Sequence, residues 1–334
     1  MRNMINLGII GTNWITQQFV EAARESGDYT LNAVYSRHIE TAKQFAKKNN
    51  AKEVFDDLDQ FFTEGTFDTL YVASPNSIHF EQAKQAIIHK KNLIVEKPAF
   101  MNPKQMNEII DLLKQYPDVL YFEAARNIHT SNFHVIQEKL HELPTVQGAQ
   151  FTYSKYSSRY DKVLEGEEPN VFSLNFAGGA LQDLGVYTVY DAIGLFGKPK
   201  ELVYYPQLVR TGVDGKGTAV LGYEKFNVIL NFSKISNSYT TSEIYGLKDL
   251  IQLDDAGEIQ QVNYVNDVGE SFMIGEKSNK NPMLPEAKDF ARIINDPEDS
   301  SNQNDYRRWL DLSVDVNNVL FKLRQSAHIM FKGE

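Results

Sequence analysis

Up to Ala125 the chain alternates short apolar runs with segments whose apolar positions recur every three or four residues. Short apolar runs predict buried strands, and the longer spacing predicts helices that bury one face. Strands and helices in alternation form βαβ units, so this pattern predicts a parallel sheet covered by helices. The predicted strands are Ile5–Ile10, Leu31–Tyr35, Thr69–Ala73, Asn92–Val95 and Leu120–Glu123, and the predicted helices are Ile15–Ser26, Ile39–Lys48, Ile78–His89 and Pro103–Gln115.

After a further predicted helix at Asn132–Leu140, the alternation gives way to a succession of strands. Strands joined without helices between them pair antiparallel, so we expect a mostly antiparallel sheet with one helix, Gly178–Leu195, packed on it. The predicted strands are Ala149–Tyr153, Glu201–Val209, Thr218–Gly222, Asn227–Phe232 and Ser242–Tyr245. Two helices, Pro285–Ile294 and Tyr306–Gln325, are predicted to close the chain, with the polar stretch Asp296–Asp305 as a loop between them.

Composition narrows the class of protein. The 334 residues exceed what one hydrophobic core usually serves, and 42% hydrophobic with 23% charged residues is typical of a soluble globular protein. A net charge of −10 repels nucleic acid and anionic lipid, so neither is an expected partner. No apolar run is long enough for a signal peptide or a spanning helix. Cysteine is absent, which excludes disulfides and thiolate chemistry and fits a cytoplasmic protein. The histidines show no metal-ligand spacing, so no metal is expected.

A degenerate glycine loop follows the first strand. Dinucleotide sites use G-x-G-x-x-G/A here, because glycine lets the backbone approach a pyrophosphate at the helix amino terminus. The chain reads Gly11-Thr12-Asn13-Trp14-Ile15-Thr16, so only the first glycine matches. An ordinary strand-to-helix turn is the alternative. Trp14 either borders a nicotinamide or substrate, or packs beneath the loop.

The end of the second strand indicates which dinucleotide is bound. A carboxylate there binds the ribose hydroxyls of NAD, whereas a cationic residue accommodates the 2′-phosphate of NADP. The chain has Ser36 and Arg37 and no carboxylate, so NADP is favoured and NAD stays possible. The alternative is that Ser36 caps the next helix and Arg37 is a solvated charge.

Two further strand ends carry candidate cofactor contacts. The third ends in Ser74-Pro75-Asn76 with His79 close behind, and small polar residues there leave room for a cofactor across the sheet edge. Asn76 or Ser77 capping the following helix is the alternative. The fourth ends in Glu96-Lys97-Pro98, which places an ammonium group where open α/β sheets bind ligands. For a strand-end lysine alone, a solvated charge is the more common explanation.

The helical segment of the second half carries a polar stripe. Asp183, Tyr187 and Asp191 are spaced four apart and share one face. Gly185 between them costs about 1 kcal/mol of helix stability relative to alanine, which indicates that something lies close to the backbone there. Taken alone, the stripe also fits a solvent-facing side.

Together these motifs resemble the Gfo/Idh/MocA oxidoreductases. The resemblance implies a Rossmann dinucleotide-binding domain, expected at residues 1–123, with a doubly wound parallel sheet. An α+β domain follows at residues 124–334, and its large, mostly antiparallel open sheet often forms a homodimer in the family. It also implies NAD(P)-dependent hydride transfer at an alcohol or carbonyl carbon of a sugar, polyol or diol.

Site roles carry over by position in the motifs. Lys97 matches the lysine beside the nicotinamide and the reacting oxygen, and Asp183 matches the aspartate that contacts substrate hydroxyls. Tyr187 stands where many members have histidine. The NADP-preferring branch that resembles dihydrodiol dehydrogenases and glucose-fructose oxidoreductase also has tyrosine at this position. The resemblance therefore predicts catalysis by Lys97, Tyr187 and Asp183. The predicted cofactor contacts are Gly11, Thr12, Asn13, Trp14, Ile15, Ser36, Arg37, Ser74, Pro75, Asn76, His79, Glu96 and Lys97.

Three interpretations stay open. The stretch Glu123–Arg126 resembles a Glu and Arg pair near the family's cleft, and an ion pair between domains explains it equally well. The aromatic and basic stretch Tyr153–Tyr160 either borders the substrate or forms an exposed loop. A non-catalytic NADP-binding sensor on the same fold is the alternative to an enzyme.

Overall fold

The computed structural model describes residues 4–334; Met1, Arg2 and Asn3 lie outside that range. The chain divides into two compact units. The first holds the residues up to Ala124 together with Met283–Ser313, and the second holds Ala125–Pro282 with Val314–Glu334. The family resemblance predicts that all residues after 123 belong to the second domain, whereas Met283–Ser313 groups with the first unit.

Helix α9, Leu284–Asn295, belongs to the first unit because it completes its core. The Tyr29 hydroxyl donates to the Ala287 carbonyl oxygen at 2.9 Å, and the Phe122 ring stacks on Phe290 with 4.7 Å between centroids. Both contacts join segments far apart in the sequence. Local pattern therefore cannot predict where α9 packs.

A six-stranded parallel sheet forms the centre of the first unit. Its order, β3-β2-β1-β4-β5-β6, reverses direction between β1 and β4, and this is the doubly wound arrangement in which ligands bind at the carboxyl ends of the strands. The predicted fold class is confirmed. The strands are β1 Ile5–Ile10, β2 Tyr29–Tyr35, β3 Glu53–Phe55, β4 Thr69–Val72, β5 Asn92–Glu96 and β6 Tyr121–Ala124.

Helices cover this sheet, and capping residues mark where some of them begin or end. The first helix stops at Gly27, whose left-handed backbone (φ 76°) lets its N–H bond the Arg24 carbonyl. Sequence analysis missed β3 and α3 because both are very short, although Asp57 caps α3 through the N–H of Gln60 at 2.9 Å. The helices are α1 Trp14–Ser26, α2 Ile39–Asn49, α3 Leu58–Glu64, α4 His79–Ile88 and α5 Pro103–Gln115.

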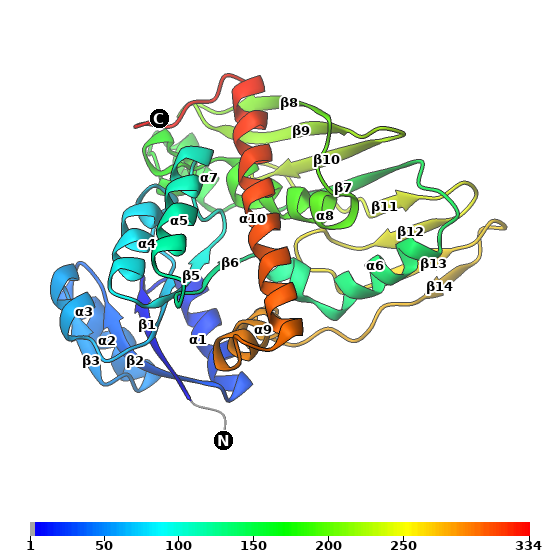
Figure 1. Cartoon of the computed structure of the whole chain (residues 1–334). Coiled ribbons are helices and arrows are strands. Elements are labelled where there is room, and N and C mark those ends of the chain that lie inside the picture. The colour runs from blue at the N-terminus through cyan, green and yellow to red at the C-terminus, as the bar shows by residue number, and fades with distance from the viewer. Residues whose placement is uncertain (1–3) are drawn as a thin grey trace. The chain divides into compact units, whose positions relative to one another are not determined.

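The second unit is built on an eight-stranded sheet with the order β14-β13-β12-β11-β7-β10-β9-β8. Every neighbouring pair is antiparallel except β7 with β10, so the expected mostly antiparallel sheet is confirmed. Helices α6, Ser131–Glu142, and α8, Val186–Phe196, pack against this sheet (Figure 1). The strands are β7 Gly148–Ser154, β8 Glu201–Leu208, β9 Asp214–Gly222, β10 Asn227–Ser233, β11 Ser242–Tyr245, β12 Leu250–Leu253, β13 Val262–Val265 and β14 Ser271–Met273.

The predicted loop at Asp296–Asp305 is wrong from Ser300 onward, because α10 spans Ser300–Ser326. The Asp299 carboxylate accepts hydrogen bonds from the backbone N–H groups of Ser301 (2.9 Å) and Asn302 (3.1 Å), as a helix cap does. The polar stretch is thus a capped helix start.

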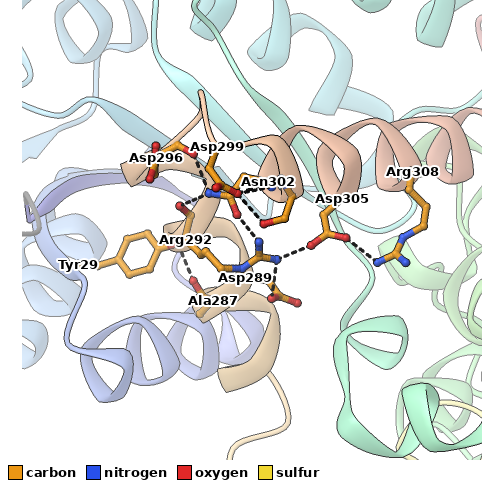
Figure 2. Close-up of polar contacts among 10 residues, drawn as sticks. Tyr29, Ala287, Asp289, Arg292, Asp296, Asp299, Asn302, Asp305 and Arg308 are labelled. Carbon is orange, nitrogen blue, oxygen red and sulfur yellow. Dashed lines mark hydrogen bonds and ion pairs between the residues drawn. The ribbon is translucent and has the colours of Figure 1, made fainter. Parts of the chain in front are cut away.

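Arg292 joins α9 to this helix start, as Figure 2 shows. Its guanidinium pairs with Asp289 at 3.3 Å and with Asp305 at 2.8 Å, and it also bonds the side chain of Asn302. The Asp305 carboxylate in turn pairs with Arg308 at 3.0 Å. Asp305, which the sequence pattern placed in the loop, therefore binds arginines of both helices.

Removing the cap should weaken the fold in a pH-dependent way. The Ser301 hydroxyl and the Asn302 N–H hold the pKa of Asp299 below its ordinary value. A lowered pKa gives stability that is present above the unfolded value and lost as the pH falls through the folded one. Asp299→Ala should therefore lower the thermal midpoint more at pH 7 than at pH 3, as measured by circular dichroism. Glu298→Ala, which removes a neighbouring exposed carboxylate, is the control, and an equal deficit at both pH values would contradict the assignment.

Candidate active site

The turn after β1 requires glycine at its first position. Gly11 has a φ of 107°, and a Cβ there would lie 2.7 Å from the carbonyl oxygen of Ala73. Such a conformation and such a contact exclude a side chain. Gly11 is the one loop position that matches the dinucleotide pattern, and the backbone there leaves no room for a side chain.

Asn13 takes the place of the second glycine and caps α1. Its Oδ1 accepts from the N–H groups of Ile15 (3.1 Å) and Thr16 (3.0 Å), while its Nδ2 donates to the Ala73 carbonyl at 2.9 Å. The loop is thus tied to the end of β4, and the amino terminus of α1 offers the partial positive charge that favours a phosphate. Trp14 is 72% exposed, which argues against packing beneath the loop.

Ser36 and Arg37 lie directly after β2. The Ser36 N–H donates to the Phe55 carbonyl at 3.1 Å, and Arg37 is exposed. The N-cap residue of α2 is His38, whose side chain makes no capping bond, and the Ser36 hydroxyl accepts from the His38 N–H at 3.5 Å, so Ser36 lies two residues before the cap position. A serine and an exposed cation at the end of β2 fit a 2′-phosphate.

His79 holds the end of β4 from inside the protein. It is 0% exposed, and its Nε2 donates to the Ser74 carbonyl at 2.8 Å. Burial lowers the pKa of His79 to about 4, so the ring is neutral at pH 7. The Ser74 hydroxyl is bound by Gln82 at 2.6 Å. Any contribution of His79 to cofactor binding therefore acts through the backbone that it supports.

The remaining candidates of this strand end and of the glycine loop are partly exposed, and the N-cap residue of α4 is Ile78, whose side chain makes no capping bond. The partly exposed residues are Thr12, Ile15, Pro75 and Asn76.

The Glu96-Lys97-Pro98 motif is anchored on both sides of the lysine. The buried Glu96 carboxylate accepts from the Tyr71 hydroxyl at 2.6 Å, and the N–H of Ala99 donates to Glu123 at 3.0 Å. Lys97 itself is partly exposed and precedes a cis peptide bond to Pro98. The ammonium is thus presented from fixed backbone at the carboxyl end of β5.

In the second unit the polar stripe is mostly buried. Its first turn, Leu181–Gly185, is π-helical and leads into α8. The Asp183 side chain is 38% exposed, whereas Tyr187 is 5% exposed and Asp191 is fully buried. A solvent-facing stripe is therefore wrong for the last two. A Cβ on Gly185 would lie 3.0 Å from the Phe232 ring, which is the close neighbour that this glycine predicted.

Tyr187 is held by contacts on several sides. Its ring meets the Tyr153 ring edge-on at 5.4 Å, and the Arg126 guanidinium lies 5.5 Å from its centroid. Arg126 in turn pairs with Glu258 at 2.6 Å. The Asn127 amide donates to the Tyr187 carbonyl at 3.2 Å. These contacts define one orientation for the phenol.

Part of the stretch Tyr153–Tyr160 is buried beside Tyr187, and part of it is exposed. Tyr153 is buried against Tyr187, whereas Lys155 and Tyr156 are exposed. The chain from Arg159 to Leu164 forms helix α7, which the sequence pattern did not predict.

Lys234 was not among the predicted site residues, although it pairs with Asp183 at 2.7 Å and is only 2% exposed. The available signal was its position directly after the apolar strand β10, like that of Lys97 after β5. Asp214, which binds the N–H of Leu181 at 2.6 Å, was not among the predicted site residues either.

Across residues 4–334 no three His, Asp or Glu side chains gather as a metal site would require. In the same range no helix has the length and apolar character needed to cross a membrane.

Comparison with known proteins places the chain among oxidoreductases. The family described as an oxidoreductase family with an NAD-binding Rossmann fold matches residues 5–124. The scyllo-inositol 2-dehydrogenase (NADP(+)) IolU of Bacillus subtilis is 38% identical over 331 residues, covering 99% of each chain. The trans-1,2-dihydrobenzene-1,2-diol dehydrogenase of Xenopus tropicalis is 25% identical over 254 residues, covering 74% of each chain.

Among solved structures, KijD10, a 3-ketoreductase from Actinomadura kijaniata in complex with NADP and TDP-benzene, superimposes with a TM-score of 0.83. It is 18% identical and covers 97% of this chain and 98% of its own, a likeness that shows the fold alone. The full-length identity to IolU, joined to the matched Rossmann domain, shows what the motifs predicted: the chain belongs to the Gfo/Idh/MocA family of oxidoreductases.

Proposed function

We propose that this protein is an NADP-dependent dehydrogenase that oxidises a secondary alcohol of a cyclic polyol, with scyllo-inositol as the first substrate to test. The observation that carries the proposal is the similarity to IolU along nearly the whole chain. Named relatives act on polyol and diol hydroxyls, in agreement with the predicted dehydrogenase of CH–OH groups.

NADP is the proposed cofactor, with NAD as a weaker alternative. The name of IolU specifies NADP(+), which agrees with the prediction from Ser36 and Arg37. The residues also fit the group: Gly11 leaves the backbone bare, Asn13 orders the start of α1, and no carboxylate follows β2. When bound, the nicotinamide supplies the hydride chemistry.

In this proposal, Lys97 and Tyr187 act on one substrate oxygen. A phenol has an unperturbed pKa of about 10, and a nearby ammonium group favours the phenolate, which makes the phenol a usable base near neutral pH. Tyr187 would take the hydroxyl proton, and Lys97 would stabilise the negative charge on the oxygen. Asp183 would accept a hydrogen bond from a neighbouring hydroxyl and so orient the ring.

The test is the absorbance of NADPH after the protein is mixed with NADP and a panel of inositols, sugars and diols. We expect turnover with at least one cyclic polyol. Binding of NADP without turnover across the panel would favour the sensor instead.

Gly11→Ala should weaken NADP binding by about tenfold or more, because a methyl group would push the loop away from Ala73. Gly27→Ala is a matched control: Gly27 also has a positive φ of 76°, but nothing lies within 4 Å of its Cβ position. Both changes impose backbone strain of about 1–2 kcal/mol. Titration of each variant with NADP, followed by tryptophan fluorescence, separates them. Equal affinities would contradict the proposed role of the loop.

The quaternary structure that we propose is a homodimer through the sheet of the second unit. One row of paired residues on its open face mixes apolar and polar side chains, and Tyr205 is 65% exposed nearby. The row is Val203, Val220, Ile229, Gln150, Glu243, Gln252 and Asn263. Light scattering should give twice the mass of the chain.

We also propose a cytoplasmic location, in keeping with a chain without cysteine.

A further inference from the structure

Lys234 is a buried cation with well-defined partners. Its Nζ lies 2.7 Å from Oδ2 of Asp183, donates to the Val171 carbonyl at 2.9 Å and lies 4.5 Å from the centre of the Phe172 ring. Its side chain is only 2% exposed. A buried ammonium group is costly unless a counter-charge and hydrogen bonds compensate it. Lys234 is therefore fixed in place by the groups around it.

These contacts join two segments that come together at a pair of glycines. Val171 lies in a 3₁₀ turn, and Asp183 lies in the π-helical turn that follows Gly178 and Gly179. A Cβ on Gly178 would lie 2.7 Å from the Val171 backbone, and one on Gly179 would lie 2.1 Å from Oδ1 of Asp214. The segment that presents Asp183 is thus packed tightly against the surroundings of Lys234.

Asp214 is the second carboxylate near this lysine. It is buried and accepts from the Leu181 N–H and the Tyr204 hydroxyl, each at 2.6 Å. Burial raises its pKa, and hydrogen bonds and the charge of Lys234 act in the opposite direction. Asp214 is thus bound to the backbone at the start of the turn, and Asp183, further along the turn, is the partly exposed partner of Lys234.

We propose that Lys234 is a positioning residue that keeps Asp183 ionised and aims it at a substrate hydroxyl. The inference rests on the proposed function and deepens it. An ionised carboxylate only accepts hydrogen bonds, so it recognises a hydroxyl donor. It also repels a carboxylate or phosphate at the same place. Lys234 therefore selects an uncharged polyol with a free hydroxyl next to the reacting carbon.

The test is the pH profile of kcat/KM for scyllo-inositol in Lys234→Met, which keeps the side chain's length but removes its charge. Without the cation, protonation of Asp183 becomes easier, so the acid limb of the profile should move to higher pH. The KM for the polyol should rise about tenfold or more at pH 7, with a smaller change in kcat and no change in NADP affinity. In Lys234→Arg the acid limb should lie closer to its wild-type pH than in Lys234→Met, because arginine keeps the positive charge.

Lys200→Met is the control, since Lys200 is an exposed lysine paired with Glu224 at 3.2 Å in the same unit. An acid limb in Lys234→Met that matches the wild type would overturn the inference. Asp183→Asn provides a second test should Lys234→Met fail to fold. The part of the limb that belongs to the proposed base Tyr187 should remain in Asp183→Asn, so an Asp183→Asn variant with both the wild-type acid limb and the wild-type KM would equally overturn it, because Asp183 would then neither titrate in the limb nor bind the substrate.

The same experiment separates this inference from the proposed function. Wild-type protein without turnover on any polyol refutes the function itself. Turnover in the wild type with an unshifted limb in Lys234→Met refutes only the role of Lys234.

Discussion

Lys97→Met is expected to lower turnover of the polyol by about 10²-fold or more while NADP binding stays mostly intact. The substitution keeps an unbranched side chain on anchored backbone, so it removes the ammonium group with little change in shape. Tyr187→Phe should have an effect of similar size, because it removes the hydroxyl that we propose as the proton acceptor and keeps the ring against Tyr153. Stopped-flow absorbance of NADPH measures both.

Two substitutions at exposed positions control for this result. Lys104→Met removes an exposed ammonium group in the first unit, and Tyr239→Phe removes the hydroxyl of a phenol that is 94% exposed in the second. Neither should change turnover. Wild-type turnover in both Lys97→Met and Tyr187→Phe would end the proposal that these two residues carry the proton transfer.

The second large effect is expected on the choice of cofactor. Ser36→Asp combined with Arg37→Ala should weaken the use of NADP by about 10²-fold, since it removes a charge-assisted contact and places a carboxylate against the 2′-phosphate. The use of NAD should change little or improve, because a carboxylate there binds ribose hydroxyls. The ratio of kcat/KM for the two cofactors is the measurement.

Lys43→Ala is the matched control, because Lys43 is an exposed cation on the neighbouring helix α2 that pairs with Glu40 at 2.8 Å. It should leave the ratio unchanged. A ratio in the double variant equal to that of the wild type would show that the 2′-phosphate is recognised elsewhere.

The strength of the local signal decided which elements could be predicted. The first strand was predicted at its observed bounds, because all its residues except Asn6 are apolar and buried. Strand β14 has only three residues, Ser271, Phe272 and Met273, and all are exposed, so it is too short to show an apolar run or an alternation. The start of α10 was missed because its cap, Asp299, belongs to a polar run that also fits a loop.

Within the candidate site, the sequence predicted the positions of those residues that directly follow a strand. The positions of Gly11 and Lys97 follow from the strands that precede them. The partnership of Asp183 with Lys234 depends on how the turn before α8 packs against the end of β10, and no sequence spacing encodes it. The burial of His79 was likewise invisible, since a histidine after a strand looks the same whether it faces a ligand or the core.

The proposed catalysis requires Lys97 and Tyr187 to act on one substrate oxygen. A crystal structure of the protein with NADP and scyllo-inositol tests it most directly. We expect the Lys97 Nζ and the Tyr187 hydroxyl both to lie within about 3 Å of the same substrate oxygen, next to the nicotinamide. A polyol bound away from either group would contradict it.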